Sequence, residues 1–270
     1  MVNLEDRTPV KDEQLEKLPT QQVEEVRTIG AVVETEGRPQ LGTMKIDLHC
    51  HSQASPDCVT PLIDIPARCA QRQVGVQAIT DHNLIWGAQK LKDLVDEQAG
   101  DTTTRLKVII GEEISSTEGE IIGLFLKQRV EAGLTPENTV EHIKAQGGLV
   151  LLPHGFDPLK RFRLRPEALV RIADSVDIVE TFNARISNPR WNRAAVQWAE
   201  SHGVLMSAGS DAHTLADIGS AWIEVPAQPI SSPQDLLDAL QGGVPVGEWT
   251  HPVIAFLLKM WDRLLRRLRA

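Results

Sequence analysis

The sequence is short of features that would point to a secreted or membrane-spanning protein. Its 270 residues include three cysteines, an odd number with no regular spacing, which indicates a reduced, intracellular protein without a disulfide framework. No apolar run approaches the roughly 20 residues that span a bilayer. The first residues also lack the basic start and apolar core of a signal peptide. We therefore expect a cytoplasmic protein.

Positive charge is also scarce. The chain has 28 Lys and Arg against 37 Asp and Glu, a formal net charge of -9. A protein that mainly grips a nucleic-acid backbone needs the opposite balance, and no basic groove studded with aromatic residues is evident. Nucleic acid is therefore not expected as the main partner, although a local basic pocket is compatible with this composition.

Hydrophobic patterning divides the chain into three parts. Residues 1–42 are polar, with one short strand candidate at 26–34, and are interpreted as an N-terminal arm or edge element. Residues 43–250 alternate short apolar runs with amphipathic segments, which indicates repeated strand and helix units. Strand candidates are 43–48, 76–80, 106–114, 120–126, 148–153, 176–181 and 204–209, and helix candidates are 61–73, 84–99, 135–147, 165–174 and 189–203.

The strand candidates predict a barrel. Near-continuous apolar strands separated by helices indicate a parallel sheet that is covered on both faces or closed on itself. Polar, chemically capable residues follow these strands at their carboxyl ends, and closure would bring those ends to one face. We expect an α/β fold with a TIM-like barrel over residues 43–250.

Residues 251–270 form a separate pattern, that of a basic amphipathic helix. We favour a final helix packed on the barrel, because an apolar stripe is the ordinary way a terminal helix buries itself. The alternative is docking to a membrane surface or a protein partner. The apolar stripe contains Ile254, Leu257, Leu258, Trp261, Leu264, Leu265 and Leu268, opposite Lys259, Arg263, Arg266, Arg267 and Arg269.

Five of the eight histidines stand at predicted strand ends beside carboxylates. An isolated His-x-His pair would usually be hydrogen-bonded or exposed, but this grouping predicts a metal centre. Imidazole and carboxylate ligands with almost no thiolate suit Zn, Mn or Fe, and more than four such groups suggest two or three ions. The residues are His49 and His51, Asp81 and His82, Glu112 and Glu113, His154, and Asp211 and His213.

The ordered series "DLHCHS", "TDHN", "GEEIS", "PHG" and "GSDAH" resembles the PHP (polymerase and histidinol phosphatase) family of metal-dependent phosphoesterases, from about residue 45 to 225. The resemblance implies a distorted seven-stranded (β/α)7 barrel with two or three divalent ions. Carried onto this sequence, one ion is held by His49, His51, Glu113 and Asp211. Glu113 bridges to a second ion bound by His154, and a further ion is held by Asp57, His82 and His213.

Other residues are expected to support these ligands. Strand alternation sends Glu112 and Glu113 to opposite faces, so Glu113 is the ligand. We expect Asp47 and Asp81 to orient ligands from behind. Between His154 and Asp211 the sequence "ETFN" offers Asn183 where three-metal relatives supply a further ligand, which favours two well-occupied ions.

The resulting functional prediction is hydrolysis of a small phosphomonoester, a nucleotide or a histidinol-phosphate-like metabolite, by a metal-bridged hydroxide. Glu113 serves as the bridge, His213 is a candidate acid for the leaving group, and Arg185, with Lys160 and Arg161 behind it, is expected to contact the phosphate. Alternatives are a phosphodiesterase or exonuclease, a non-catalytic metal-binding scaffold, and an amidohydrolase-like enzyme.

Overall fold

The computed structural model describes residues 42–97, 106–254, 256–257 and 260–261. The chain divides into two units, Met1–Gln40 and Leu41–Ala270. The first unit, which contains the predicted arm and the strand candidate at 26–34, lies outside the described residues. The description below concerns the second unit.

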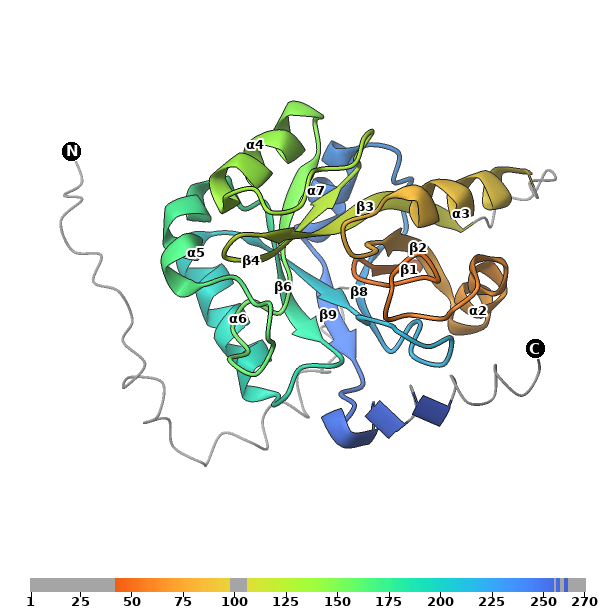
Figure 1. Ribbon diagram of the computed structural model, residues 1–270. Helices are drawn as coiled ribbons and strands as arrows, with labels where there is room; N and C mark the ends of the chain where they lie inside the picture. The colour runs from red at the N-terminus through yellow and green to blue at the C-terminus, as the bar shows by residue number, and fades with distance from the viewer. Residues whose placement is uncertain (1–41, 98–105, 255, 258–259, 262–270) are drawn as a thin grey trace, which may run out of the picture. The chain divides into compact units, whose positions relative to one another are not determined.

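A nine-stranded, nearly closed sheet organises this unit, in the order β7-β6-β5-β4-β3-β2-β1-β8-β9 (Figure 1). The predicted α/β, barrel-like fold is present, but the seven-strand count is wrong. All seven strand candidates correspond to β1–β7, whereas β8 and β9 were not predicted. The strands are β1 Thr43–Asp47, β2 Val74–Ile79, β3 Lys107–Ser116, β4 Gly119–Leu124, β5 Leu149–Leu152, β6 Ile178–Asn183, β7 Leu205–Gly209, β8 Ala221–Pro226 and β9 Val244–Gly247.

The sheet is mixed, not wholly parallel as expected. β4 runs antiparallel to both neighbours, because a two-residue turn joins it to β3 and pairs Ser116 with Gly119. β8 is antiparallel to β1 and β9. The remaining adjacent pairs, β1–β2, β2–β3, β5–β6 and β6–β7, are parallel. The consequence is that β3 and β4 form one hairpin beside the carboxyl ends of the parallel strands.

Hydrogen bonds beyond the carboxyl ends of β1 and β7 draw the two sides of the sheet together. The Leu48 amide donates to the Ala208 carbonyl at 3.2 Å, the Asp211 amide to the His49 carbonyl at 2.8 Å, and the His51 amide to the Ala212 carbonyl at 3.0 Å. The earlier part of β1 pairs with β8 instead. Closure therefore occurs where the histidine-rich segments lie.

Helices flank the strands on the outside (Figure 1). Several begin with proline at the first turn, where its missing N–H costs nothing. Thr135 additionally caps α4 by accepting the Asn138 amide. The five helix candidates are found, and α7, which opens with a capping box at Ser232, was not predicted. The elements are η3 Leu62–Asp64, α2 Ile65–Arg72, α3 Trp86–Glu97, α4 Pro136–Ala145, α5 Pro166–Ile172, η4 Ala173–Ser175, α6 Arg190–His202 and α7 Pro233–Leu240.

A buried apolar cluster joins the strands to one another. It takes residues from β1 to β6 and from β8, and α7 adds Leu236 and Leu240. Such a layer of side chains makes the inside of a barrel a packed core, not a channel. Later residues of the same strands and the segments after them supply a buried polar layer, which includes Asp47, His49 and Glu113.

The C-terminal segment is tied to the barrel only as far as residue 250 among the described residues. The Trp249 indole donates to the Ile186 carbonyl at 2.7 Å and the Thr250 amide to the Ala184 carbonyl at 2.9 Å. From Val253 to Trp261 the described large apolar side chains are 47–61 % exposed. The favoured interpretation of a helix packed on the barrel is therefore not borne out for these residues, and the predicted basic side chains lie outside the described part of the chain.

Across the residues that the structure describes, no helix has the length and apolar character required to cross a membrane.

Deleting residues 252–270 should leave the barrel intact, because the described side chains of this segment are exposed. We expect the midpoint of thermal unfolding to change by no more than about 2 °C. As a control, Trp249→Ala removes a hydrogen bond to the barrel and should lower the free energy of unfolding by about 1 kcal/mol or more. A drop of many degrees on deletion would show that the segment packs on the barrel after all.

Candidate metal centre

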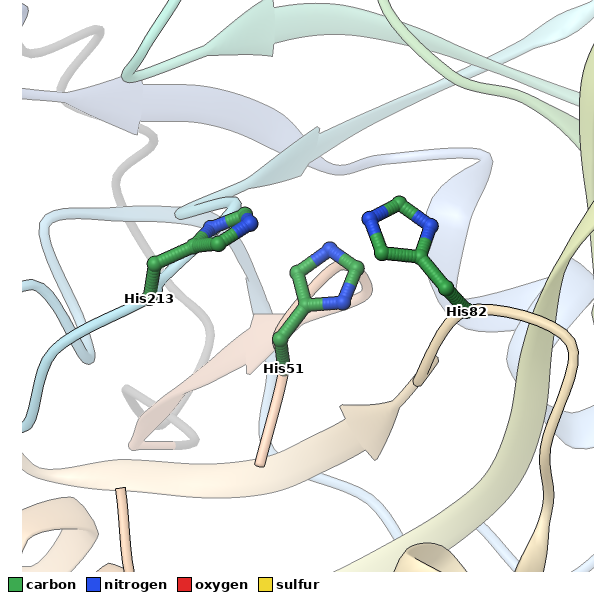
Figure 2. Close-up of side chains that lie close together, drawn as sticks. All are labelled: His51, His82 and His213. Carbon is green, nitrogen blue, oxygen red and sulfur yellow. The ribbon is translucent and has the colours of Figure 1, made fainter. Parts of the chain in front are cut away.

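The five histidines at strand ends do converge in space. Figure 2 shows the rings of His51, His82 and His213 turned toward one another although they come from three separate segments. Their ring centroids are 4.4 Å apart for His51 and His213, and 4.5 Å for His51 and His82. The His49 ring is 5.2 Å from that of His51, and the His154 ring is 5.6 Å from that of His49. The predicted clustering of imidazoles is therefore present in the fold.

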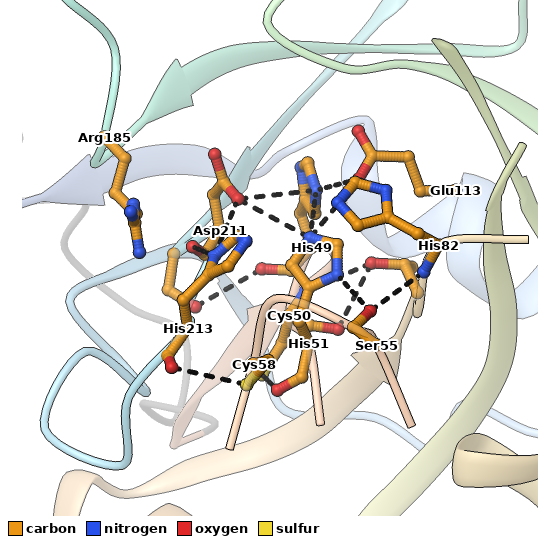
Figure 3. Close-up of polar contacts among 12 residues, drawn as sticks. His49, Cys50, His51, Ser55, Cys58, His82, Glu113, Arg185, Asp211 and His213 are labelled. Atoms are coloured by element: carbon orange, nitrogen blue, oxygen red, sulfur yellow. Dashed lines mark hydrogen bonds and ion pairs between the residues drawn. The ribbon is translucent and has the colours of Figure 1, made fainter. Parts of the chain in front are cut away.

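Glu113 contacts four of the five histidines, and Figure 3 shows its side chain beside the His82 ring. Its Oε2 is 3.3 Å from the Nε2 atoms of His49 and His51 and 3.2 Å from His82 Nδ1. Its Oε1 is 3.0 Å from His154 Nε2. As strand alternation predicted, Glu112 faces away and accepts the Val130 amide. One carboxylate thus faces four imidazoles, the arrangement expected of a group shared between ions.

His49 is held from behind by a carboxylate that the sequence reasoning missed. Its Nδ1 lies 3.0 Å from Glu180 Oε1, so the other ring nitrogen, Nε2, faces Glu113. Glu180 is buried and also accepts the His154 amide at 2.8 Å. A carboxylate behind a histidine fixes its ring and tautomer and makes it a better metal ligand. Gly209 permits this packing, because a Cβ there would collide with Glu180 and His49.

His51 is oriented by a hydroxyl group. Its Nδ1 is 3.1 Å from Ser55 Oγ, which also accepts the His82 amide at 2.9 Å. Ser55 therefore joins two of the histidine segments. The Nε2 of His51 is left facing Glu113 and, at 3.5 Å, Asp211 Oδ1.

The third predicted group, Asp57, His82 and His213, is also brought together. His213 Nδ1 donates to the Asp211 carbonyl at 2.8 Å, which turns Nε2 toward Asp57 Oδ2 at 2.7 Å. His82 Nε2 is 3.8 Å from Asp57 Oδ1. Asp57 is more than a third exposed, so this group opens toward solvent while Glu113 is enclosed.

Two cationic side chains flank the cluster beside Asp211. The Lys160 ammonium forms an ion pair with Asp211 Oδ2. Arg185 lies beside Asp211 and His213 in Figure 3, with its buried Nη1 3.6 Å from Asp217 and without a hydrogen bond. Arg161, in contrast, is exposed and stacks on Phe162. Of the predicted phosphate contacts, Lys160 and Arg185 are placed at the cluster and Arg161 is not.

Asp47 and Asp81, predicted to orient ligands, and Asn183, noted beside them, have distinct places. Asp47 holds the backbone rather than an imidazole, accepting the amides of His49 and Ser210. Asp81 accepts the Ser52 amide at 2.6 Å and its hydroxyl at 2.7 Å, which anchors the loop after His51. Asn183 donates to Glu180 at 3.0 Å and, at 3.4 Å, to Asp211.

Glu120 is a second carboxylate that was missed. It lies on β4 with Oε1 3.6 Å from His82 Nδ1 and Oε2 3.8 Å from His154 Nε2. The hairpin register places it there, since Glu120 pairs directly with Ser115, and Ser115 is two residues from Glu113. Residues two apart on a strand, and their partners directly across an antiparallel pair, share one face.

Crowding gives the carboxyl groups very different proton affinities. Burial disfavours the charged form of Asp211, but Lys160 and His49 outweigh it and hold the pKa of Asp211 well below its usual range. Burial, reinforced by the charge of Glu113, raises the pKa of Glu120 to about 9. At neutral pH the ion-free cluster therefore keeps a proton on Glu120.

The histidines are affected in opposite directions. Burial disfavours the charged form of His51, but hydrogen bonds to Asp211 and Glu113 outweigh it and raise the pKa of His51 to about 9. Burial, with the positive charge of His51, lowers the pKa of His213 to about 3. His213 is thus neutral at pH 7, with its Nε2 facing Asp57 Oδ2.

These residues fit divalent cations. Ligand atoms within 4.8 Å of one another form four overlapping groups of three. A single oxygen of Glu113 faces three imidazole nitrogens, more donors than one carboxylate oxygen usually satisfies, and cations between them would resolve the crowding. The groups are His51–His82–His213, His49–His51–Glu113, His49–His154–Asp211 and His82–Glu113–Glu120.

Comparison with known proteins agrees with this site. The PHP domain model matches residues 47–179, and the PHP-associated model matches residues 189–245. Uncharacterized protein MJ0417 of Methanocaldococcus jannaschii is 33% identical over 199 residues, covering 72% of this chain and 75% of the relative. The chain belongs to the PHP domain family, which confirms the resemblance read from its motifs, and the family's metal-dependent phosphoester hydrolysis is the class of chemistry that the site serves.

Solved structures share the fold. A two-domain protein from Bacteroides vulgatus, containing a predicted PHP-like metal-dependent phosphoesterase, superposes with a TM-score of 0.60 at 16% identity, covering 78% of this chain and 68% of that one. The lesion-specific endonuclease PfuEndoQ from Pyrococcus furiosus gives 0.54 at 13% identity, covering 78% and 60%. At these identities the likeness concerns the fold alone.

Glu180→Gln should weaken metal binding while leaving the barrel folded. The amide keeps the size of the side chain but removes the charge behind His49, so we expect manganese affinity to fall about 10- to 100-fold. Titration calorimetry measures this, with circular dichroism to check folding. Glu137→Gln, on exposed α4, is the matched control and should bind manganese like the natural protein. Equal affinities in all three proteins would show that Glu180 does not act on His49.

Metal binding should release protons. Glu120 and His51 have raised pKa values and carry protons at pH 7, and a cation must displace them. Manganese affinity should therefore rise between pH 7 and 9, by about tenfold per pH unit for each linked proton. Calorimetry in two buffers of different ionisation enthalpy measures the number of protons released on binding. The Glu120→Gln variant should release fewer protons than the natural protein. A pH-independent affinity would contradict this assignment.

Proposed function

We propose that this protein is a phosphatase that hydrolyses a small phosphomonoester with the aid of two or three divalent ions, such as Mn, Zn or Fe. The observation that carries the proposal is the position of Lys160 and Arg185 on one flank of the carboxylate and imidazole cluster. A terminal phosphate has several anionic oxygens, and two cations beside a divalent-ion centre are suited to bind them.

The residues that would hold the ions are His49, His51, Glu113, His154 and Asp211, with Asp57, His82 and His213 toward solvent. Glu120 joins this set on the evidence of its position. Divalent ions bound here would lower the pKa of coordinated water toward neutrality and would neutralise charge on phosphate oxygens. The burial of Glu113 and His49 keeps competing water away from the ligands.

Arg185 has a free hydrogen-bonding position for an anion. Its buried Nη1 has no hydrogen-bond partner, and its backbone amide is fixed by Asn183 Oδ1 at 2.8 Å. The Asp217 carboxylate lies 3.6 Å from Nη1, beyond hydrogen-bond distance, so this buried nitrogen still lacks a close acceptor, which a ligand can supply. We propose that a phosphate oxygen is that acceptor. Lys160, paired with Asp211, supplies the second positive charge.

His213 is better suited to hold a cation than to protonate the leaving group. Its lowered pKa keeps it neutral at pH 7, and its one ring proton is already donated to the Asp211 carbonyl. A neutral imidazole with its lone pair toward the site is the form in which histidine binds metals. We therefore assign it as a ligand, and we do not assign it the role of acid that the sequence suggested.

The experiment that tests the proposal is phosphate release by the manganese- or zinc-loaded full chain from a panel of phosphomonoesters and oligonucleotides. We expect release from small monoesters. Lys160→Met and Arg185→Met should each lower kcat/KM by about 100-fold, because each removes one charge that stabilises the transition state. Glu113→Gln should abolish both metal binding and turnover.

Lys92→Met provides the control, since Lys92 pairs with Asp96 on exposed α3 and should leave kinetics unchanged. Cleavage of oligonucleotides without release from monoesters would favour the phosphodiesterase or exonuclease alternative. A metal-loaded protein that is inert on the whole panel would favour the scaffold alternative.

A further inference from the structure

The segment Asp157–Arg163, between β5 and α5, carries two exposed apolar side chains on either side of the lysine that reaches the metal centre. Leu159 is 78 % and Phe162 is 54 % exposed. We propose that this segment is a platform that selects phosphomonoesters with a planar aromatic leaving group, such as a nucleoside, with Phe162 as the specificity-determining residue. The inference rests on the proposed phosphatase function.

One end of the platform is fixed by a buried carboxylate outside the metal cluster. Asp157 accepts the Ser187 hydroxyl and amide, both at 2.6 Å, and the Leu159 amide at 2.9 Å. It is fully buried although it contacts no histidine ring among the described residues. Asp157 therefore joins the platform to the loop that follows Arg185, the other predicted phosphate contact.

The other end is fixed to the β3–β4 hairpin. The Glu120 amide donates to the Phe162 carbonyl at 2.8 Å, and the Arg165 amide to the Glu118 carbonyl at 2.8 Å. Gly119, at φ +131°, allows this approach, because a Cβ would collide with the Arg163 carbonyl oxygen. The backbone of Phe162 is thus bonded to the residue whose carboxylate lies in the metal cluster.

The lysine and the apolar side chains of the platform point in different directions. Lys160 turns inward to Asp211, while Leu159 and Phe162 remain at the surface. Arg161 lies over the Phe162 ring, with its guanidinium carbon 5.1 Å from the ring centroid. The segment that supplies the lysine therefore also carries an aromatic ring and a guanidinium plane, both of which bind planar rings.

This combination favours one class of leaving group. A phosphate contacting Lys160 carries its leaving group out toward the residues beside that lysine. A nucleobase can stack on Phe162 and Arg161 and cover the exposed apolar surface, whereas an aliphatic alcohol has no planar face to offer. Rigid anchoring at Asp157 and Glu120 means that little ordering is required on binding.

The test compares adenosine monophosphate with glycerol phosphate as substrates of the metal-loaded full chain. Phe162→Ala should raise KM for adenosine monophosphate about fivefold or more, with kcat within twofold, and should leave the kinetics with glycerol phosphate unchanged. Phe162→Trp should restore the low KM. Phe256→Ala removes a similarly exposed phenylalanine from the C-terminal segment and should change neither substrate.

The results separate this inference from the proposed function. Turnover of glycerol phosphate without turnover of adenosine monophosphate, or equal effects of Phe162→Ala on both substrates, overturns the platform and leaves the phosphatase assignment standing. If neither substrate is hydrolysed, the phosphatase assignment fails, and calorimetry then decides on the platform. Weaker binding of adenosine monophosphate by the Phe162→Ala variant than by the natural protein supports the platform. Equal binding by the two proteins overturns the platform.

Discussion

The shared approach of four histidines to the carboxylate of Glu113 is the constraint on which the rest of the site depends. Glu113 is buried, and an uncompensated charge there would be prohibitive, so positive charge must be supplied by protonated imidazoles or by cations. Glu180 and Glu120, the surrounding carboxylates, increase the amount of positive charge that is required. The raised pKa values of His51 and Glu120 mean that, without a bound ion, protons on these groups compensate the negative charge. We expect the same groups to act as ligands where cations replace the protons.

Two residues of the cluster have unusual backbone conformations. His154 and Asp211 have φ values of +27° and +48°, in the left-handed region that side chains usually avoid. Both follow strand ends, and both side chains reach Glu113 or its neighbours. Strained backbone at positions that the surrounding structure holds firmly is characteristic of functional sites. Here the hydrogen bonds from the His154 amide to Glu180 and from the Asp211 amide to the His49 carbonyl hold these conformations.

Much of the barrel and its histidines could be predicted from sequence, because both depend on local patterns. Apolar runs gave β1–β7, and strand alternation distinguished Glu113 from Glu112. β8 and β9 escaped because the pairing of β8 with β1, and of β9 with β8, depends on antiparallel and long-range contacts that periodicity does not report. Glu180 was overlooked although its motif was noted, since a histidine or cysteine was sought there and a carboxylate holding His49 from behind was not considered.

The reversal of β4 explains the remaining omissions together. A wholly parallel sheet places Glu120 at the start of its strand, far from the carboxyl ends where ligands were sought. The tight turn after Ser116 instead folds β4 back along β3, so that the face carrying Glu113 also carries Glu120. The same turn presents the Glu118 carbonyl and the Glu120 amide to the segment after β5, and their hydrogen bonds hold the backbone of Phe162 and Arg165 against the hairpin. One local choice of turn therefore adds a carboxylate to the candidate metal centre and anchors the segment that we propose as the substrate platform.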